Sequence, residues 1–464
     1  MQNESTRAAE KMGRRAGLAA FVGTTVEWYD FYIYGTASAL VFGKVFFPEV
    51  SPAIGVLLSF ATFWVGFLAR PLGGIVFGHL GDRVGRKKAL VATMMLMGFS
   101  TLAIGLMPSY ATIGIAAPLL LVLCRLIQGV AVGGEWGGAV LIATEHVDRR
   151  RGYLFGAYAQ QGSPAGQLLA SLAFLIVSQL PDDAFMGWGW RIPFLASVVL
   201  VIVGMVMRLR LAETPAMEKL RSNDETVRFP LLEVVRTHAG ILVLGICACA
   251  IAFTAGYIKN TFALSWAVND VGFTRDTFLS VVLVASITQF IVQPFGAVLA
   301  GRWSVRRVVS VLLILELPAL PIMFVLVAQG NFALAALGMA IATVPHVMYY
   351  SILAGLLAES FPVAIRYTAI SLAYGLTGTL LGGTTPMIGQ SLFTAFDSIV
   401  PVIVFSMVPV LLSLFGANML LRRAQADRAA VSGSNAAEKR GTLDAAARDL
   451  PAADLLRRSE SEAR

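Results

Sequence analysis

The sequence predicts an all-α membrane protein with twelve transmembrane helices, arranged as two pseudo-symmetric six-helix bundles with both termini in the cytoplasm. Three observations lead to this fold class. Hydrophobic residues make up 57% of the 464-residue chain and charged residues only 14%, too few to cover a water-soluble globule. Apolar runs of roughly 20–28 residues recur along the chain, each long enough to cross a hydrocarbon layer of about 30 Å. A polar linker divides these runs into two sets of six.

The apolar runs give the predicted spans in chain order. The boundary between the last two spans is the weakest, since little more than Phe396-Asp397-Ser398 separates them. We expect spans at 17–43, 53–80, 89–107, 112–144, 153–180, 190–211, 239–268, 275–300, 308–328, 332–358, 368–396 and 398–421.

The positions of the basic residues predict the topology. With the N-terminus inside, all but six of the 36 Lys and Arg residues fall in cytoplasmic segments. Cationic loops resist translocation, so both termini are expected in the cytoplasm of a multi-pass protein of the inner (plasma) membrane. The first apolar run is too long for a cleavable signal peptide and should remain as the first helix.

The chain therefore divides into five regions. Its two halves look related, because Gly81–Lys87 aligns with Gly301–Arg307 and the Glu145/Arg150 pair parallels Glu359/Arg366. The tail has no sustained apolar heptad and is expected to be mostly disordered, with a short helix at most. The regions are a cytoplasmic N-terminus (1–16), an N-terminal bundle (17–211), a cytoplasmic linker (212–238), a C-terminal bundle (239–421) and a cytoplasmic tail (422–464).

Residues 70–88 are expected to form a sharp polar turn between the second and third spans. Lys and Arg are dense there, and its glycines permit tight turning and close helix approach. Asp82, at the membrane edge, can accept hydrogen bonds from Arg or from a helix N-terminus. The alternative to a functional role is a polar turn that only ends a membrane helix.

Charged residues within the spans are the candidate functional groups. Each costs roughly 2.5–3.5 kcal/mol on insertion scales, so each needs a partner or a purpose. They occur on the first, fourth, seventh and tenth spans: Glu27 and Asp30 on one face of the first, Arg125 and Glu135 on the fourth, Lys259 on the seventh and His346 on the tenth.

Structural explanations exist for most of these groups. Arg125 could pair with Glu27 or Asp30 without a further role, Glu135 could serve packing, and His346 could be a satisfied core histidine. Lys259 is harder to explain in this way, because no acid lies within a turn of it. Glu316 in the ninth span is expected to be paired or at the lipid edge, and no function is assigned to it.

Other protein classes are not supported. The net charge of +8 is carried by loops between apolar spans, which argues against nucleic-acid binding. Three cysteines lie inside apolar spans, and we interpret them as small buried hydrophobic residues. The sequence contains no metal cluster, nucleophile elbow or phosphate loop, so we expect neither an enzyme nor a cofactor other than the coupling proton. We expect a monomer.

Several motifs together resemble the metabolite:proton symporter family of the major facilitator superfamily. They are Glu27–Gly35, Gly66–Gly74, Gly78–Lys88, Arg125–Gly129 with Gly133–Gly138, and Trp188–Phe194 followed by Glu213-Thr214-Pro215. Members of that family include shikimate, 2-oxoglutarate, citrate and proline/betaine permeases. The resemblance covers about residues 15–425. It implies a central cavity lined by spans 1, 4, 7 and 10, and alternating access driven by a proton gradient.

The resemblance also implies a gating turn that latches the two halves while the cytoplasmic side is closed. In the second half, Arg302 stands where Asp is expected and Val305 where Gly is expected, so that latch should be paired differently. The predicted gating residues are Gly78, Asp82, Arg83, Gly85, Arg86, Lys87, Glu145, Arg150, Glu359 and Arg366.

The leading hypothesis is proton-coupled uptake of a small organic anion, such as a hydroxy acid or a di- or tricarboxylate. Alternatives are a zwitterionic osmolyte such as proline or betaine, drug:proton antiport, and a non-transporting membrane sensor. Glu27, Asp30, Arg125 and Glu135 are the predicted proton-coupling residues. The predicted substrate-binding residues are Arg125, Lys259, His346, Tyr29, Tyr32, Tyr34, Gln160, Gln161 and Tyr349.

Overall fold

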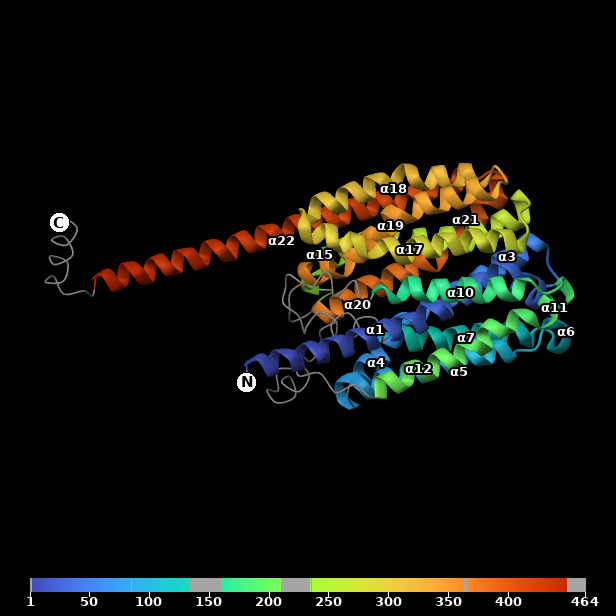
Figure 1. The fold of residues 1–464 in the computed structure, drawn as a ribbon, viewed down its shortest axis with the longest axis horizontal. Helices are drawn as coiled ribbons and strands as arrows, with labels where there is room; N and C mark the ends of the chain where they lie inside the picture. The colour runs from blue at the N-terminus through green and yellow to red at the C-terminus, as the bar shows by residue number, and fades with distance from the viewer. Residues whose placement is uncertain are drawn as a thin grey trace.

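The structure, a computed structural model, describes residues 2–84, 86–133, 160–209, 234, 236–361 and 366–448. Within those residues the regular structure is helical, without strands. The helices run along the long axis of the molecule, and the start of α1 and the end of α22 project from the same end (Figure 1). The first residues of α1 and the last residues of α22 thus lie on the same side of the bundles.

The first half contains the helices that match the first six predicted spans. They are α1 (Gln2–Ala37) continued by the π-helical turn η1 (Ser38–Phe42) and α2 (Gly43–Phe46), α3 (Pro52–Leu68), α4 (Arg70–Val84), α5 (Arg86–Leu106), α6 (Tyr110–Ile113), α7 (Ala116–Gly133), α10 (Gly162–Ser178), α11 (Asp182–Gly187), η2 (Gly189–Arg191) and α12 (Ile192–Leu209).

The second half contains the helices that match the last six. They are α15 (Ala239–Tyr257) continued by η3 (Ile258–Phe262), α16 (Ala263–Trp266) and η4 (Ala267–Val271), then α17 (Arg275–Arg302), α18 (Val305–Val327), α19 (Phe332–Ser360), α20 (Arg366–Thr377) continued by η6 (Gly378–Gly382), α21 (Thr384–Phe396) and α22 (Val400–Arg448).

Helix packing repeats between the halves. In the first half α1 packs on α10, α3 and α4 on α7, and α5 on α12; in the second, α15 packs on α20, α17 on α19, and α18 on α22. These are the same pairs by position: first with fifth, second with fourth, third with sixth. The bundles form two layers in Figure 1, joined where α10 meets α17 and α3 meets α21. The predicted pseudo-symmetric fold is confirmed.

Among the described residues, eight helices are long and apolar enough to cross a membrane, and α5 and α10 contain shorter apolar segments. The first and eleventh predicted spans are helical but less apolar. In α1 this reflects the polar residues of its inner face, where Glu27 and Asp30 are buried. Large apolar side chains such as Phe99, Ile176 and Phe415 are exposed on the outside of the bundle, as a lipid-facing surface requires.

Glycines set the distance between the second and fourth spans. A Cβ on Gly73, Gly129 or Gly133 would overlap a backbone carbonyl of the facing helix, those of Val130, Gly66 and Arg70 respectively. Small residues let backbones approach in this way where water exclusion does not drive association. This close crossing holds the C-terminal end of α7 against the end of α3 and the start of α4.

Two local predictions differ from the structure. The helix expected to end in a turn at 70–88 breaks earlier, at Ala69, and α4 then continues through the charged motif to Val84. Pro71 favours this break, because proline fits the first turn of a helix but not its interior. The tail is not mostly disordered up to Arg448, since α22 continues to that residue. Its many Ala and Arg residues have high helix propensity.

Candidate functional site

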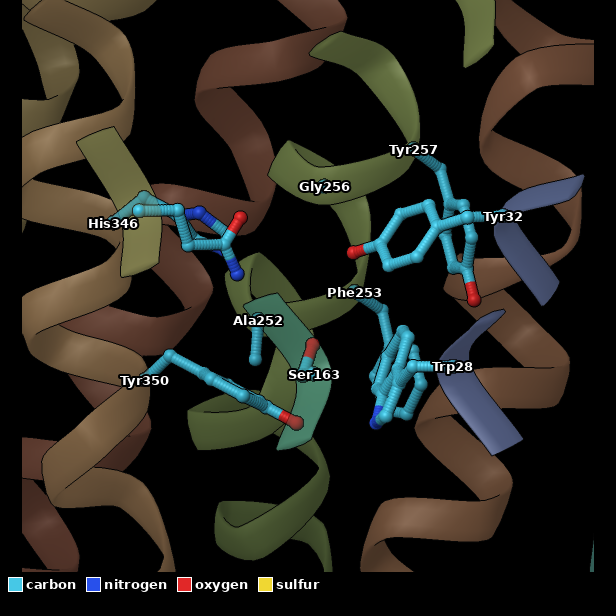
Figure 2. A pocket seen from close by; sticks show the side chains of 10 residues that line it. Trp28, Tyr32, Ser163, Ala252, Phe253, Gly256, Tyr257, His346 and Tyr350 are labelled. Atoms are coloured by element: carbon cyan, nitrogen blue, oxygen red, sulfur yellow. The ribbon is translucent and has the colours of Figure 1, made fainter. Parts of the chain in front are cut away.

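A small cavity lies between the two bundles, near their centre. Its volume is about 10 Å³, room for about one water molecule. Five helices contribute its walls, α1 and α10 from the first half and α15, α17 and α19 from the second (Figure 2). The lining residues are Trp28, Tyr32, Ser163, Ala252, Phe253, Gly256, Tyr257, Gln289, His346 and Tyr350.

Aromatic rings dominate one side of this cavity. Trp28 stacks on Tyr32 with ring centroids 5.6 Å apart and meets Tyr350 edge-on at 6.5 Å. The hydroxyls of Tyr350 and Tyr374 are 3.0 Å apart. Glu27 lies within electrostatic range of both. This wall can bind hydroxyl groups, and its ring faces can also attract a cation.

The opposite side carries basic groups of the C-terminal bundle. Lys259 comes from the π-helical turn η3, a wide turn often found at functional sites. Its ammonium Nζ lies 3.2 Å from each of three acceptors on α19: the carbonyl of Ala342, Oγ1 of Thr343 and Nδ1 of His346. A protonated lysine only donates, so Nδ1 accepts and the histidine proton belongs on Nε2.

His346 therefore offers a donor to the cavity. Its Nε2 is buried and has no hydrogen-bond partner among the described residues. In Figure 2 the side chain lies across the cavity from Tyr32 and Tyr257. Lys259 does not line the cavity itself but lies behind His346 and places a positive charge there. An anionic oxygen is the natural acceptor for this arrangement.

Arg125 occupies a separate polar cluster in the N-terminal bundle. It is 1% exposed, and its guanidinium carbon lies 3.8 Å from the centre of the Tyr34 ring. Gly66 on α3 leaves room for it, because a Cβ there would lie 3.2 Å from the arginine Nε. Two of its nitrogens, Nε and Nη2, have no hydrogen-bond partner among the described residues.

A chain of hydrogen bonds joins Arg125 to Asp30. Arg125 Nη1 donates to Gln128 Oε1 at 2.8 Å, and Gln128 Nε2 donates to Thr101 Oγ1 at 2.6 Å. Thr101 in turn donates to Asp30 Oδ2 at 2.7 Å. All four side chains are buried. The expected link between this arginine and an acid of the first span thus runs through two intermediate polar side chains.

Arg70 is a buried cation that the sequence reasoning placed only in the polar turn. Its guanidinium carbon lies 4.5 Å from the ring centre of Phe31 and 4.2 Å from that of Phe67, while Arg125 lies 5.1 Å from Phe31. Phe31 is therefore contacted by two arginines. Arg125 was selected because it is a charged residue within an apolar run. The same criterion applies to Arg70.

Three predicted tyrosines have their hydroxyls directed outside the cavity. Tyr29 donates to the carbonyl of Pro193, Tyr34 bonds Thr62 Oγ1, and Tyr349 donates to the carbonyl of Ala248, each at 2.7 Å. In this conformation these hydroxyls hold helices together. Of the predicted substrate-binding residues, Tyr32 and His346 line the cavity.

The predicted glutamines join the two halves. Gln160 Nε2 donates to the carbonyl of Tyr350 at 3.3 Å, and Gln161 Nε2 donates to the carbonyl of Phe290 at 2.6 Å. The backbone carbonyl of Gln160 accepts from Gln293 Nε2 at 2.9 Å. These contacts lie where α10 meets α17 and α19, beside the cavity. Separation of the bundles on this side requires them to break.

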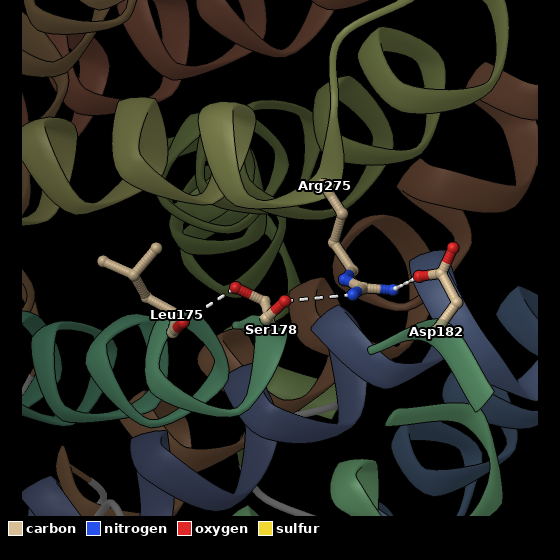
Figure 3. A network of polar contacts seen from close by, with 4 residues as sticks. All are labelled: Leu175, Ser178, Asp182 and Arg275. Atoms are coloured by element: carbon tan, nitrogen blue, oxygen red, sulfur yellow. Dashed lines mark hydrogen bonds and ion pairs between the residues drawn. The ribbon is translucent and has the colours of Figure 1, made fainter. Parts of the chain in front are cut away.

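A second set of contacts joins the halves at the end remote from the termini (Figure 3). Arg275 at the start of α17 donates to Asp182 Oδ1 and to the carbonyl of Ser178, both at 3.0 Å. Its guanidinium also lies 3.8 Å from the ring centre of Phe185. At the same end, a hollow of about 640 Å³ lies between the end of α1, the start of α3 and residues of η4 and α21.

For several predicted residues, the backbone or the side chain lies outside the part of the chain that the structure describes. The backbone positions 85, 134–159 and 362–365 are not described, so Gly85, Glu135, Glu145 and Arg150 receive no placement. Gly78, Asp82 and Arg83 belong to helix α4, Arg86 and Lys87 to α5, and Arg366 to α20. Their side-chain surroundings lie outside the described part of the chain. Glu359 is half-buried near the end of α19.

Comparison with known proteins gives consistent relatives. The family model "Sugar (and other) transporter" matches residues 16–228. The shikimate transporter of Escherichia coli (strain K12) is 40% identical over 387 residues, covering 82% of this chain and 88% of the relative. The inner membrane metabolite transport protein YhjE of the same organism is also 40% identical, over 391 residues with the same two coverages.

A proline/betaine transporter of Salmonella typhimurium is 35% identical over 422 residues, covering 88% of this chain and 83% of the relative. Among solved structures, a partially occluded inward-open conformation of the xylose transporter XylE from E. coli superposes with a TM-score of 0.71 at 16% identity. It covers 89% of this chain and 98% of that chain. At such identity the structural likeness concerns the fold alone.

Proposed function

This chain belongs to the metabolite:proton symporter family of the major facilitator superfamily, and we propose that it carries a small organic anion into the cell together with protons. It would work by alternating access in the inner membrane. The observation that carries the proposal is the buried donor His346 Nε2, which lines the cavity between the bundles and has Lys259 behind it.

The substrate carboxylate would accept a hydrogen bond from His346, with the charge of Lys259 strengthening it in a low-dielectric interior. Hydroxyl groups of the substrate would meet Tyr32 and Tyr257 on the opposite wall and Tyr350 one turn along α19 from His346 (Figure 2). The cavity of about 10 Å³ corresponds to a contracted state. Loading requires the bundles to separate at one end, which is the motion that alternating access supplies.

Proton coupling would use the acids of the first span. Asp30 connects to Arg125 through Thr101 and Gln128, so a proton on Asp30 would weaken the hydrogen bond that it accepts and loosen this chain. Glu27 lies on the same helix, within electrostatic range of the cavity tyrosines Tyr257 and Tyr350. Substrate bound at these tyrosines would therefore change the electrostatic environment of Glu27. Symport of a monoanion with one proton is electroneutral. A second proton would add roughly 2.3 kcal/mol per 100 mV of membrane potential.

Opening and closing would use the contacts between halves. The bonds of Gln160 and Gln161 lie beside the cavity, and the Arg275–Asp182 pair lies at the end remote from the termini. The charged motif of α4 and α5 is proposed to latch the end that carries the termini, which would be cytoplasmic. In each open state of the transporter, the contacts at one end would break and those at the other end would remain.

A zwitterion such as proline or betaine is the second candidate, and the aromatic wall favours it. Trp28, Tyr32 and Tyr350 present ring faces and edges to the cavity, and Glu27 lies nearby. This combination suits a quaternary or secondary ammonium, while His346 would still take the carboxylate. Both candidates share a carboxylate, and they differ in whether the other end is cationic.

Uptake into proteoliposomes tests the proposal. Vesicles with an imposed pH gradient, acidic outside, should accumulate radiolabelled shikimate, and a protonophore should abolish accumulation. Unlabelled carboxylates should compete better than betaine if the substrate is an anion, and the reverse order supports the zwitterion. Failure to accumulate any carboxylate-bearing probe would refute proton-coupled uptake.

A further inference from the structure

Glu316 on α18 is a buried acid that the proposed mechanism does not use. Its side chain is fully buried, and neither carboxylate oxygen has a hydrogen-bond partner among the described residues. A carboxylate in such surroundings is stable only when it is protonated or lies opposite a cation, because burial removes the water that stabilises its charge. The identity of its neighbours decides what it can do.

Lys259 is a buried cation within electrostatic range of Glu316. The two groups interact electrostatically, and Glu316 also lies near the backbone of His346. All three ammonium hydrogens of Lys259 have acceptors on α19, the carbonyl of Ala342, Thr343 Oγ1 and His346 Nδ1. Lys259 and Glu316 therefore attract each other through space while the lysine remains hydrogen-bonded to the histidine.

No other charged group at membrane depth comes from the helices packed on α18 in the described structure. Besides α19, these are α17 and α22. Their residues 277–301 and 400–421 contain no Asp, Glu, Lys, Arg or His. On α19 the hydroxyl of Tyr349 points to the carbonyl of Ala248 on α15. When both groups are ionised, the pair Glu316–Lys259 is neutral overall, and His346 connects it to the cavity.

We infer that Glu316, Lys259 and His346 form a second proton-exchanging site, in which Glu316 is the resident counter-ion that a substrate carboxylate replaces. In the empty carrier Glu316 is ionised and neutralises Lys259. When a carboxylate binds at His346 Nε2, two anions would share one ammonium ion. A proton from solvent then bonds to a Glu316 oxygen and restores neutrality, and no other bond is formed or broken.

This inference rests on the proposed function and makes it specific. Binding of one carboxylate in the C-terminal bundle brings one proton, in addition to the proton exchanged at the acids of the first span. A monoanion would then enter with two protons and a net positive charge. With the membrane potential held at zero, accumulation at equilibrium should rise as the square of the proton gradient.

The experiment compares the wild type with Glu316→Gln in proteoliposomes, with shikimate and betaine as probes. Glutamine mimics the protonated acid, so the variant should still exchange labelled for unlabelled probe but should carry one proton fewer. Across a tenfold proton gradient, accumulation should fall from about 100-fold to about 10-fold. Asp397→Asn is the matched control, since Asp397 is an exposed acid at a positive φ that asparagine tolerates.

The outcomes are distinct. If the wild type accumulates neither probe nor any other carboxylate, the proposed function fails. If it accumulates a probe with one proton, or if Glu316→Gln keeps the wild-type ratio, the second site is refuted while the function stands. Loss of exchange in the variant refutes the claim that a neutral Glu316 is the substrate-bound form. The inference is supported if the wild type carries two protons per substrate molecule and Glu316→Gln carries one.

Discussion

Thr101→Val tests the link between Arg125 and Asp30. The change keeps the size and shape of the side chain and removes one hydroxyl, which accepts from Gln128 at 2.6 Å and donates to Asp30 at 2.7 Å. One buried amide hydrogen and one carboxylate oxygen then lose a partner, at about 1–3 kcal/mol each. If about 2 kcal/mol of this stabilises the coupled arrangement, its population falls about 30-fold relative to uncoupled states.

The assay measures two quantities on the same proteoliposomes. Accumulation of labelled shikimate driven by a pH gradient should fall by an order of magnitude or more in Thr101→Val, while exchange of labelled for unlabelled probe, which needs no net proton movement, should persist. Thr101→Ser retains the hydroxyl and should behave as the wild type. Undiminished accumulation in Thr101→Val would show that the hydrogen-bonded chain does not carry coupling.

Three further changes test other parts of the account. The double variant Glu27→Gln, Asp30→Asn should lose proton-driven accumulation of shikimate but keep exchange, and accumulation against a gradient would contradict the coupling role. Trp28→Leu should weaken betaine uptake about 2- to 30-fold, the range expected from about 0.5–2 kcal/mol of cation–π attraction, and shikimate uptake less; equal effects argue against an ammonium on the aromatic wall. Arg275→Ala should lower the melting temperature in detergent by only a few degrees, because its partner Asp182 is 87% exposed and such pairs contribute about 1 kcal/mol or less. Loss of folding would mean that this contact holds the halves together.

The spans were predictable because the bilayer imposes one length on every helix. Apolar runs near 20 residues have no other stable solution in hydrocarbon, so even the short break at Phe396–Ser398 was found. There α21 ends at Phe396, and Asp397 adopts the left-handed conformation that stops a helix. The repeat of motifs between the halves predicted two related bundles, and the structure shows the same helix pairs in both, since duplicated sequences pack alike.

Contacts between helices were not predictable from one sequence. Glycines and charges at 70–88 indicated a turn, yet α4 runs from Arg70 to Val84, and its start packs closely against Val130 and Gly133 of α7. Hydropathy placed Glu316 within a span but could not show that Lys259 lies within electrostatic range of it, since the two residues are distant in sequence. The packing of α18 against α19 brings Glu316 near this lysine and His346.

The packing of the helices also determines which tyrosine hydroxyls reach the cavity. Tyr32 and Tyr34 lie on the same helix, and both were predicted to place a hydroxyl at membrane depth. A rotation of 200° along the helix separates them, so Tyr32 lines the cavity and Tyr34 bonds Thr62 on α3. Which face is inward depends on the packing of α1 against α3 and α10, which a single sequence does not encode in readable form.

Proton movement on substrate addition tests the central claim most directly. Wild-type proteoliposomes, without an imposed gradient, are suspended in weakly buffered medium with a pH electrode, and shikimate is added outside. The account predicts that the medium becomes more alkaline as labelled shikimate enters, and that Glu316→Gln reduces the number of protons taken up per molecule. Entry of the label without any change in external pH would contradict a proton-coupled carrier.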